Sequence, residues 1–352
     1  MKQIFQSLAN GETLISEIPS PSIKSGHLLI KSSFSLISSG TERTLINFGK
    51  SNLIEKAKGQ PDRVKDVLDK VKADGLITTY QAVKSKLELP IPLGYCNVGE
   101  VIEVGEGVKE FNVGDKVVSN GPHAEIILVP KNLCALVPKD LNEIEAVFTV
   151  PASIGLQGIR LFKPTFGETV CVIGLGLIGI LTAQLLKSQG CRVLGFDIDQ
   201  KKCNLAEELG IKTVPFDLKE EPGNWFLEMT NNIGVDGVII TASTNSNEPI
   251  TIASKICRKR GRIILIGVTQ LNIKRELFYE KEISFQVSCS YGPGRYDPLY
   301  EEDGIDYPIG FVRWTEKRNF EAILYSLRTK QLKVEKLISN KFDIKDAKSA
   351  YK

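Results

Sequence analysis

Three glycines have the spacing and setting that hold a dinucleotide. Gly174, Gly176 and Gly179 directly follow an apolar run over 169–173 that is typical of a buried strand, and they open an apolar helical stretch. In this setting the first glycine permits a tight turn, the second leaves the backbone open to a pyrophosphate, and the third lets helix and strand pack closely. The sequence therefore predicts that phosphates bind at the amino end of this helix, beside the amides of Leu177 and Ile178.

An aspartate beyond this motif points to the kind of dinucleotide. Asp197 follows the next predicted strand, where a carboxylate accepts hydrogen bonds from ribose hydroxyls and repels a 2′-phosphate. The sequence thus favours NAD over NADP as the cofactor. Asp199 could share this role, although Asp197 lies nearer to the end of the strand. The alternative interpretation is that the glycines are ordinary turn residues and that Asp197 is a solvated strand end.

Two later positions are predicted to border the nicotinamide. Thr241 and Gly267 follow further apolar strands, at the edge of a parallel sheet where ligands bind. Ordinary strand-to-loop turns would explain both residues equally well.

The elements that position these residues divide the chain in two. From 153 onward, near-continuous apolar runs alternate with helical stretches, the pattern of a parallel sheet covered on both faces. We expect strands over 169–173, 192–196, 237–241, 262–267 and 283–289 in a doubly wound Rossmann domain. Residues 1 to about 45 and 89–150 are rich in short β-type runs, which predict a small β-barrel domain. A helical pair is expected at 51–88, and another helix at about 316–329.

Composition excludes several classes of function. The 45 basic and 42 acidic side chains are interspersed and leave a net charge of +3, so bulk charge does not predict binding to nucleic acid or a membrane. We expect no leader and no membrane span, and hence a cytoplasmic protein. The seven cysteines form no CxxC pair and there are only two histidines, which makes a structural zinc site unexpected.

Several motifs together resemble the medium-chain dehydrogenase/reductase family, relatives of zinc alcohol dehydrogenase. They are GYCNVGEV at 94–101, VGDKV at 113–117, the glycine motif, and the order of barrel, sheet and return to the barrel. The resemblance implies a GroES-like catalytic domain at 1–152, a NAD-binding Rossmann domain at 153–291, and a specificity loop with a return to the catalytic domain at 292–352. It also implies a substrate cleft between the domains and a homo-oligomer.

The zinc ligands of that family are missing from this chain. Ser39 and Tyr95 stand at two familiar ligand positions, and 149–151 offers no Cys, His or acid at the third. The resemblance therefore implies a zinc-free member with no metal site. The Tyr95 and Ser39 hydroxyls, with Glu42 and His123 nearby, are the candidate catalytic groups, and Tyr95 ranks first. Structural roles compete with each assignment, including stacking by Tyr95, a turn at His123 and an ion pair of Glu42.

The stretch from Ser290 to Glu316 narrows the resemblance further. It is similar to the dehydrogenase half of bacterial bi-domain oxidoreductases, which tend to accompany surface-polysaccharide assembly, so a second oxidoreductase domain is a possible partner. Arg295, Tyr296, Arg313 and Trp314 could recognise a sugar nucleotide, by aromatic stacking and two-point pairing with phosphate. The same residue types also suit a lid or a subunit contact.

We therefore hypothesise a NAD-dependent, zinc-independent oxidoreductase. Its substrate would be a secondary hydroxyl or keto group of a sugar or nucleotide sugar, a small molecule, in surface-polysaccharide biosynthesis. A zinc-free quinone or enone reductase is a second hypothesis, but such enzymes commonly use NADPH, which Asp197 disfavours. A third is a non-catalytic NAD-binding module of a larger oxidoreductase.

Overall fold

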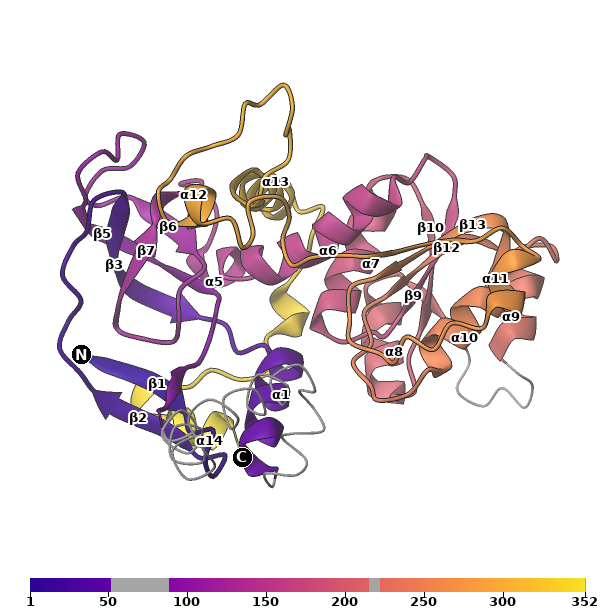
Figure 1. Cartoon of the computed structure of the whole chain (residues 1–352), viewed down its shortest axis with the longest axis horizontal. Coiled ribbons are helices and arrows are strands. Elements are labelled where there is room, and N and C mark those ends of the chain that lie inside the picture. Colours follow the sequence, from indigo (N-terminus) through magenta and orange to yellow (C-terminus); the bar gives the residue numbers. More distant parts are fainter. Residues whose placement is uncertain (52–88, 215–221, 352) are drawn as a thin grey trace, which may run out of the picture.

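The chain folds into two lobes joined by one helix and by a returning segment (Figure 1). This computed structural model describes residues 1–51, 89–214 and 222–351. The helical pair expected at 51–88 lies outside the described residues.

The first lobe contains two antiparallel sheets. The larger has strand order β7-β3-β5-β6-β8 and curls into a half-barrel, and the smaller has the order β2-β1-β4. Its elements are β1 (Lys2–Gln6), β2 (Thr13–Glu17), β3 (His27–Ser35), α1 (Ser39–Lys50), β4 (Ile91–Pro92), β5 (Asn97–Val104), β6 (Lys116–Ser119), β7 (Ile126–Pro130), η1 (Lys131–Leu133), β8 (Cys134–Leu136) and α5 (Glu143–Ala146). Its core includes Leu28, Val98 and Val117, which are fully buried. The predicted barrel-type domain is therefore confirmed.

One local expectation in this lobe is wrong. Strands were expected to about residue 45, but helix α1 begins at Ser39. The Ser38 amide donates to Glu42 Oε1 at 2.8 Å, while the Glu42 amide donates to the Ser38 carbonyl at 3.0 Å. The second bond is an ordinary helical one, and the first is a side-chain cap with the acid one residue later than in the usual capping box.

Helix α6 (Thr149–Phe162) connects the lobes and runs across the predicted boundary at 152/153. Glycines on this helix let it approach the second lobe, because a Cβ at Gly155 would lie 2.4 Å from Thr182 Oγ1 and one at Gly158 would lie 2.3 Å from Ile266. One hydrophobic core consequently runs from the half-barrel through α6 to the second lobe.

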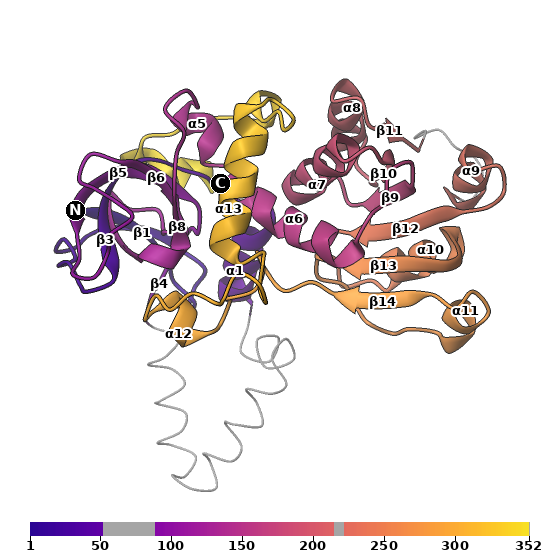
Figure 2. The same cartoon turned by 90° about the horizontal axis from the view of Figure 1, so that it is seen from above.

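The second lobe is a doubly wound Rossmann domain. All six strands are parallel, in the order β11-β10-β9-β12-β13-β14, with helices on both faces (Figure 2). Its elements are β9 (Thr169–Ile173), α7 (Leu177–Ser188), β10 (Arg192–Phe196), α8 (Gln200–Glu208), β11 (Lys212–Thr213), α9 (Pro222–Met229), β12 (Val235–Ile240), α10 (Glu248–Ile256), β13 (Cys257–Leu265), α11 (Arg275–Tyr279) and β14 (Ser284–Val287). The five predicted strands are confirmed, with shifted ends for the last three.

The chain then returns to the first lobe. A long loop after Tyr291 contains α12 (Pro298–Glu301) and leads into α13 (Glu316–Arg328), which confirms the predicted helix. Short elements follow, namely η2 (Glu335–Leu337), η3 (Ile344–Asp346) and α14 (Ala347–Ala350). Ala347 packs with Ile4 of the small sheet and with Leu93, which directly follows β4. Among the described residues, no helix has the length and apolar character needed to cross a membrane.

Candidate functional site

The glycine motif has the close approaches that its sequence predicts. Gly174 has φ +96°, and a Cβ there would lie 2.6 Å from the Ala242 amide nitrogen. A Cβ at Gly179 would lie 1.8 Å from the Gly174 carbonyl oxygen, so helix α7 can sit this close only with glycine. At Gly174 and Gly179, the close contacts around the turn between β9 and α7 thus exclude a side chain.

Gly176 is different, because its surroundings are empty. It caps α7, is exposed, and a Cβ placed on it would meet no atom within 4 Å. Leu177 and Ile178 form the first helical turn, whose amides have no partner within the helix. An open glycine beside unpartnered amides at a helix start is the cradle that a pyrophosphate fits.

Asp197 lies directly after β10 and braces this cradle. Its Oδ2 accepts from the Leu175 amide at 2.7 Å and its Oδ1 accepts from the Asp199 amide at 2.9 Å. Lys202 Nζ lies 3.6 Å from Oδ2. Asp199 instead caps α8 by accepting from the Lys201 amide. The structure therefore places Asp197, and not Asp199, against the glycine loop.

Thr241 and Gly267 lie behind the same loop. The Thr241 hydroxyl donates to the Gly174 carbonyl oxygen at 2.6 Å. A Cβ at Gly267 would lie 2.0 Å from the Ala242 carbonyl oxygen, so these two turns pack backbone to backbone. Both residues thus pack at the carboxyl ends of the strands, next to the glycine motif.

On the first lobe, a buried carboxylate brings together distant parts of the chain. Glu42 Oε2 lies 3.2 Å from His123 Nε2 and accepts from the Tyr351 hydroxyl at 2.5 Å, while Oε1 accepts from the Ser38 amide. Glu42 and His123 are each 1% exposed. Burial and the Glu42 charge both raise the pKa of the Tyr351 phenol, which keeps that donor protonated.

His123 also contacts the segment that carries Tyr95. Gly94 has φ +91°, and a Cβ there would lie 2.6 Å from the His123 ring, so the imidazole rests directly on the Gly94 backbone. Tyr95 is half-buried against the main core. Ser39 is the first residue of α1, and its side chain lies outside the described part of the structure.

A residue near the third zinc position that the resemblance implies makes a structural contact. Thr149 begins α6, is fully buried, and donates its hydroxyl to the Ala146 carbonyl oxygen at 2.6 Å. Within residues 1–51, 89–214 and 222–351, no three His, Cys, Asp or Glu side chains are placed to hold a metal ion.

The predicted substrate residues fall into two separate groups on the loop after Tyr291. Arg295 pairs with Glu301 at 2.6 Å and lies over the ring of Tyr296, which is 70% exposed. Arg313 lies over the ring of Trp314 with 3.9 Å from the guanidinium carbon to the ring centre. The structure thus brings together each neighbouring pair but not all four residues.

Two residues that contact the predicted site residues were not identified from the sequence. Tyr351 reaches Glu42 from the far end of the chain, and Arg160 reaches Trp314 from α6, with 3.5 Å from its guanidinium carbon to the ring centre. Neither carries a motif, so no sequence signal identifies them.

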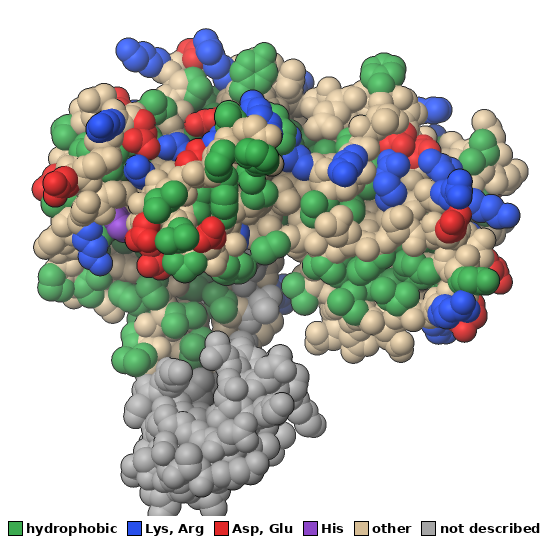
Figure 3. All heavy atoms as spheres, turned by 45° about the horizontal axis from the view of Figure 1, so that its top comes forward, with side chains coloured by type: hydrophobic (Ala, Val, Ile, Leu, Met, Phe, Trp, Pro, Cys, Tyr) green, Lys and Arg blue, Asp and Glu red, His purple; other side chains and the backbone are tan. Residues whose placement is uncertain are grey.

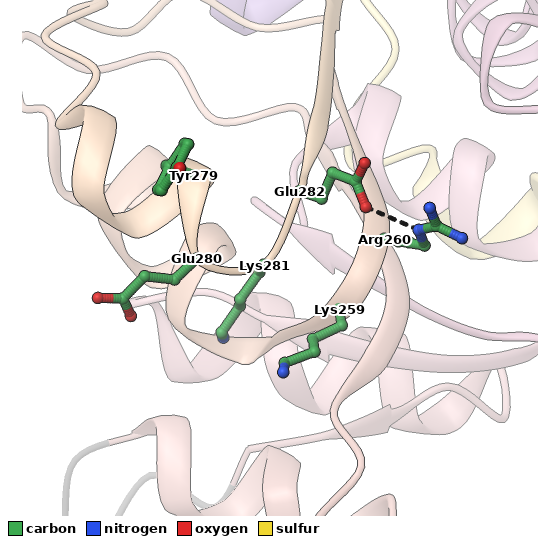
Figure 4. Close-up of a pocket in the computed structure, with 6 residues that line it drawn as sticks. All are labelled: Lys259, Arg260, Tyr279, Glu280, Lys281 and Glu282. Carbon is green, nitrogen blue, oxygen red and sulfur yellow. Dashed lines mark hydrogen bonds and ion pairs between the residues drawn. The ribbon is translucent and has the colours of Figure 1, made fainter.

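A surface depression on the Rossmann lobe lies away from these groups (Figure 4). It is lined by residues of the first half of β13 and of the turn from α11 to β14, at the amino ends of these strands, whereas the glycine motif follows the carboxyl end of β9. Lys281 Nζ donates there to the Ser254, Lys255 and Cys257 carbonyl oxygens, and Arg260 pairs with Glu282. The Lys281 ammonium caps the carboxyl end of α10, which gives the charge a structural role.

Comparison with known proteins agrees with this architecture. The family described as "Alcohol dehydrogenase GroES-like domain" matches residues 65–172, and the family described as "Zinc-binding dehydrogenase" matches residues 178–302. The chain is 28% identical over 256 residues to D-guloside 3-dehydrogenase of Escherichia coli K12, covering 70% of this chain and 68% of the relative. It is 26% identical over 249 residues to sorbitol dehydrogenase of Halalkalibacterium halodurans, covering 59% and 71%.

Solved structures show the same fold at lower identity. The alcohol dehydrogenase TADH from Thermus sp. ATN1 superposes with a TM-score of 0.74 at 18% identity, covering 100% of this chain and 95% of that one. The half-barrel, the Rossmann sheet and the two matched families together confirm the resemblance drawn from the motifs. The chain is therefore a dehydrogenase of the medium-chain dehydrogenase/reductase family.

Proposed function

We propose that this protein is a NAD-dependent, zinc-independent oxidoreductase acting on a secondary hydroxyl or keto group of a sugar or nucleotide sugar. The observation that carries the proposal is the open Gly176 cradle braced by Asp197. The names of the relatives, sorbitol dehydrogenase and D-guloside 3-dehydrogenase, support a sugar-type substrate.

The cofactor assignment rests on the residues around the cradle. Gly174, Gly176 and Gly179 would hold the pyrophosphate, and Asp197 would accept the ribose hydroxyls. Ile198 follows Asp197 and is 86% exposed, which offers an apolar surface to an adenine ring. When bound, NAD supplies the hydride acceptor, and the remaining task for the protein is to position the substrate and move its hydroxyl proton.

The proton chemistry is assigned to the first lobe. We propose that the Tyr95 and Ser39 hydroxyls act on the substrate hydroxyl and that Glu42 and His123 position them. The contact of the His123 ring with Gly94 fixes the backbone next to Tyr95, and the Ser38–Glu42 pair fixes the backbone next to Ser39. Zinc independence is supported by the residue types at the implied ligand positions, because the hydroxyls of Ser39 and Tyr95 are not the Cys, His or acidic ligands that zinc prefers.

Broader assignments follow from the resemblance to bi-domain oxidoreductases. They are a role in surface-polysaccharide biosynthesis in the cytoplasm, assembly into a homo-oligomer, and cooperation with a second oxidoreductase domain. The edge strand β14 supports oligomerisation, because Val287 on it is 53% exposed and the strand pairs only with β13 among the described strands.

Turnover and metal content test the proposal together. Sugars, polyols and nucleotide sugars are screened with NAD and with NADP for absorbance at the reduced-nicotinamide band, and zinc is measured in the same preparation. We expect NAD-dependent turnover with no stoichiometric zinc, and at least 100-fold slower turnover for Tyr95→Phe. One zinc per active chain, or full activity of Tyr95→Phe, would contradict the catalytic assignment.

A further inference from the structure

The inference concerns two arginines that share one tryptophan ring. The Arg160 guanidinium carbon lies 3.5 Å from the Trp314 ring centre and that of Arg313 lies 3.9 Å from it. Arg160 comes from α6 and Arg313 from the loop before α13, so the pair forms only when the returning segment packs on the connecting helix. We call Arg160 and Arg313, which both stack on Trp314, the arginine pair.

The charge of the arginine pair is not neutralised. Every other arginine of the loop and of α13 is paired with a carboxylate, namely Arg295 with Glu301, Arg318 with Asp306 and Arg328 with Asp140. Within the described residues, no carboxylate lies in ion-pair distance of Arg160 or Arg313. The loop is rich in acids, yet none of them reaches this pair.

Placing two like charges together costs free energy that a ligand could recover. Burial and the nearby Arg313 charge lower the pKa of Arg160 to about 10. The Arg160 Nε donates to Asn319 Oδ1 at 2.7 Å, and this is the hydrogen bond that holds its guanidinium. The terminal nitrogens of both arginines therefore remain as donors, and stacking on the indole fixes their planes.

The arginine pair lies at the junction of the lobes. Asn319 is fully buried and donates its Nδ2 to the Tyr291 carbonyl oxygen at 2.8 Å, at the start of the returning segment. The upper face of this junction is seen in Figure 3, where blue basic side chains lie beside green apolar ones.

We propose that the arginine pair binds a phosphate group of the substrate, so that the enzyme acts on a phosphate-bearing sugar. Planar guanidinium groups pair with phosphate oxygens in two-point fashion, and two of them match the charge of a phosphate monoester or a diphosphate. Within the specificity loop this assigns phosphate recognition to Arg313 with Arg160, since Arg295 is already paired with Glu301. The proposal rests on the proposed sugar oxidoreductase activity.

Calorimetric titration of NAD-saturated protein tests the site, because filling the dinucleotide site prevents probes from binding there. The probes are glucose 1-phosphate, uridine diphosphate and the neutral methyl glucoside. We expect both phosphate probes to bind the wild type, and Arg160→Gln and Arg313→Gln each to weaken them about 10-fold to 100-fold. The tighter of the two phosphate probes distinguishes a sugar phosphate from a nucleotide sugar.

Matched variants separate binding from folding. Arg328→Gln removes an exposed arginine of α13 and is expected to leave affinity unchanged, and Arg313→Gln changes an exposed side chain that folding does not require. Equal affinity in wild type, Arg160→Gln and Arg313→Gln, or no binding of either phosphate probe to the wild type, would overturn the proposal. Turnover of a neutral sugar with NAD would then leave the proposed function standing, whereas phosphate binding without any sugar turnover would contradict that function alone.

Discussion

The dinucleotide motif occupies one short run, 174–179. The Glu42 cluster, which consists of Glu42 with Ser38, His123 and Tyr351, joins residues from three distant parts of the chain. The first is held by backbone contacts that glycine alone permits, as at Gly179. The second is held by side-chain hydrogen bonds to one buried carboxylate, from His123 and Tyr351. A local motif of close contacts tolerates little change in shape, whereas a polar cluster tolerates little change in charge or hydrogen bonding.

Among changes to the Glu42 cluster, removing the Glu42 carboxylate is expected to lower the stability of the protein most. Glu42→Ala leaves the Ser38 amide, His123 and Tyr351 buried without their acceptor, and we expect the free energy of unfolding to fall by about 3 to 5 kcal/mol. Urea denaturation measures it. Tyr351→Phe removes one donor only and should cost about 1 kcal/mol. Equal losses for the two variants would show that the carboxylate does not organise the cluster.

Two glycines of the same motif are expected to differ in whether their replacement lowers protein stability or only NAD affinity. Gly179→Ala forces a methyl group against the Gly174 carbonyl, so we expect about 1 to 3 kcal/mol lower stability together with weakened NAD binding. Gly176→Ala has open space and should leave stability unchanged, yet weaken NAD at least tenfold because the methyl group occupies the phosphate cradle. Denaturation curves and NAD titrations on both variants test this. Normal NAD affinity in Gly176→Ala would place the phosphates elsewhere.

Asp197 combines features of both regions, because its side chain forms a hydrogen bond with the backbone of the glycine loop. Asp197→Ala removes the acceptor of the Leu175 amide and the predicted partner of the ribose. We expect NAD to bind about tenfold or more weakly, with a smaller loss for NADP. Titration with each dinucleotide measures the ratio. If both affinities fell equally, the acid would brace the loop without reading the ribose.

Glu316 gives an effect that depends on pH. It is fully buried at the start of α13, its carboxylate oxygens have no hydrogen-bond partner in the described residues, and burial with the Glu301 charge raises its pKa to about 9. The folded state therefore binds this proton more tightly than the unfolded state, so the stability contribution present at acid pH is lost as pH rises from about 4.5 to about 9.

Glu316→Gln keeps the shape and removes the titration. We expect the variant to be more stable than wild type at pH 8, by up to about 4 kcal/mol, with the difference shrinking towards pH 5. Melting temperatures over this pH range measure the effect, and Glu335→Gln on the exposed surface is the control. A constant difference at all pH values would mean that Glu316 does not titrate in this window.

The Rossmann strands, the glycine motif and the position of Asp197 could be predicted from the sequence, because their spacing is local and each role follows from backbone geometry. The sequence also identified the family from short motifs such as GYCNVGEV. The prediction of strands to about residue 45 was wrong, because α1 begins at Ser39. The Ser38–Glu42 cap favours a helix there and the neighbouring β-type residues favour a strand, and the sequence alone does not show which prevails.

Which distant side chains meet could be seen only in the folded chain. Tyr351 lies far from Glu42 in sequence, and Arg160 lies on a different element from Trp314, so neither contact has a periodic or spacing signal. Long-range contacts of this kind depend on how the returning segment packs on α6 and the half-barrel. The cofactor half could therefore be predicted residue by residue, whereas the substrate half depends on the packing of the two lobes.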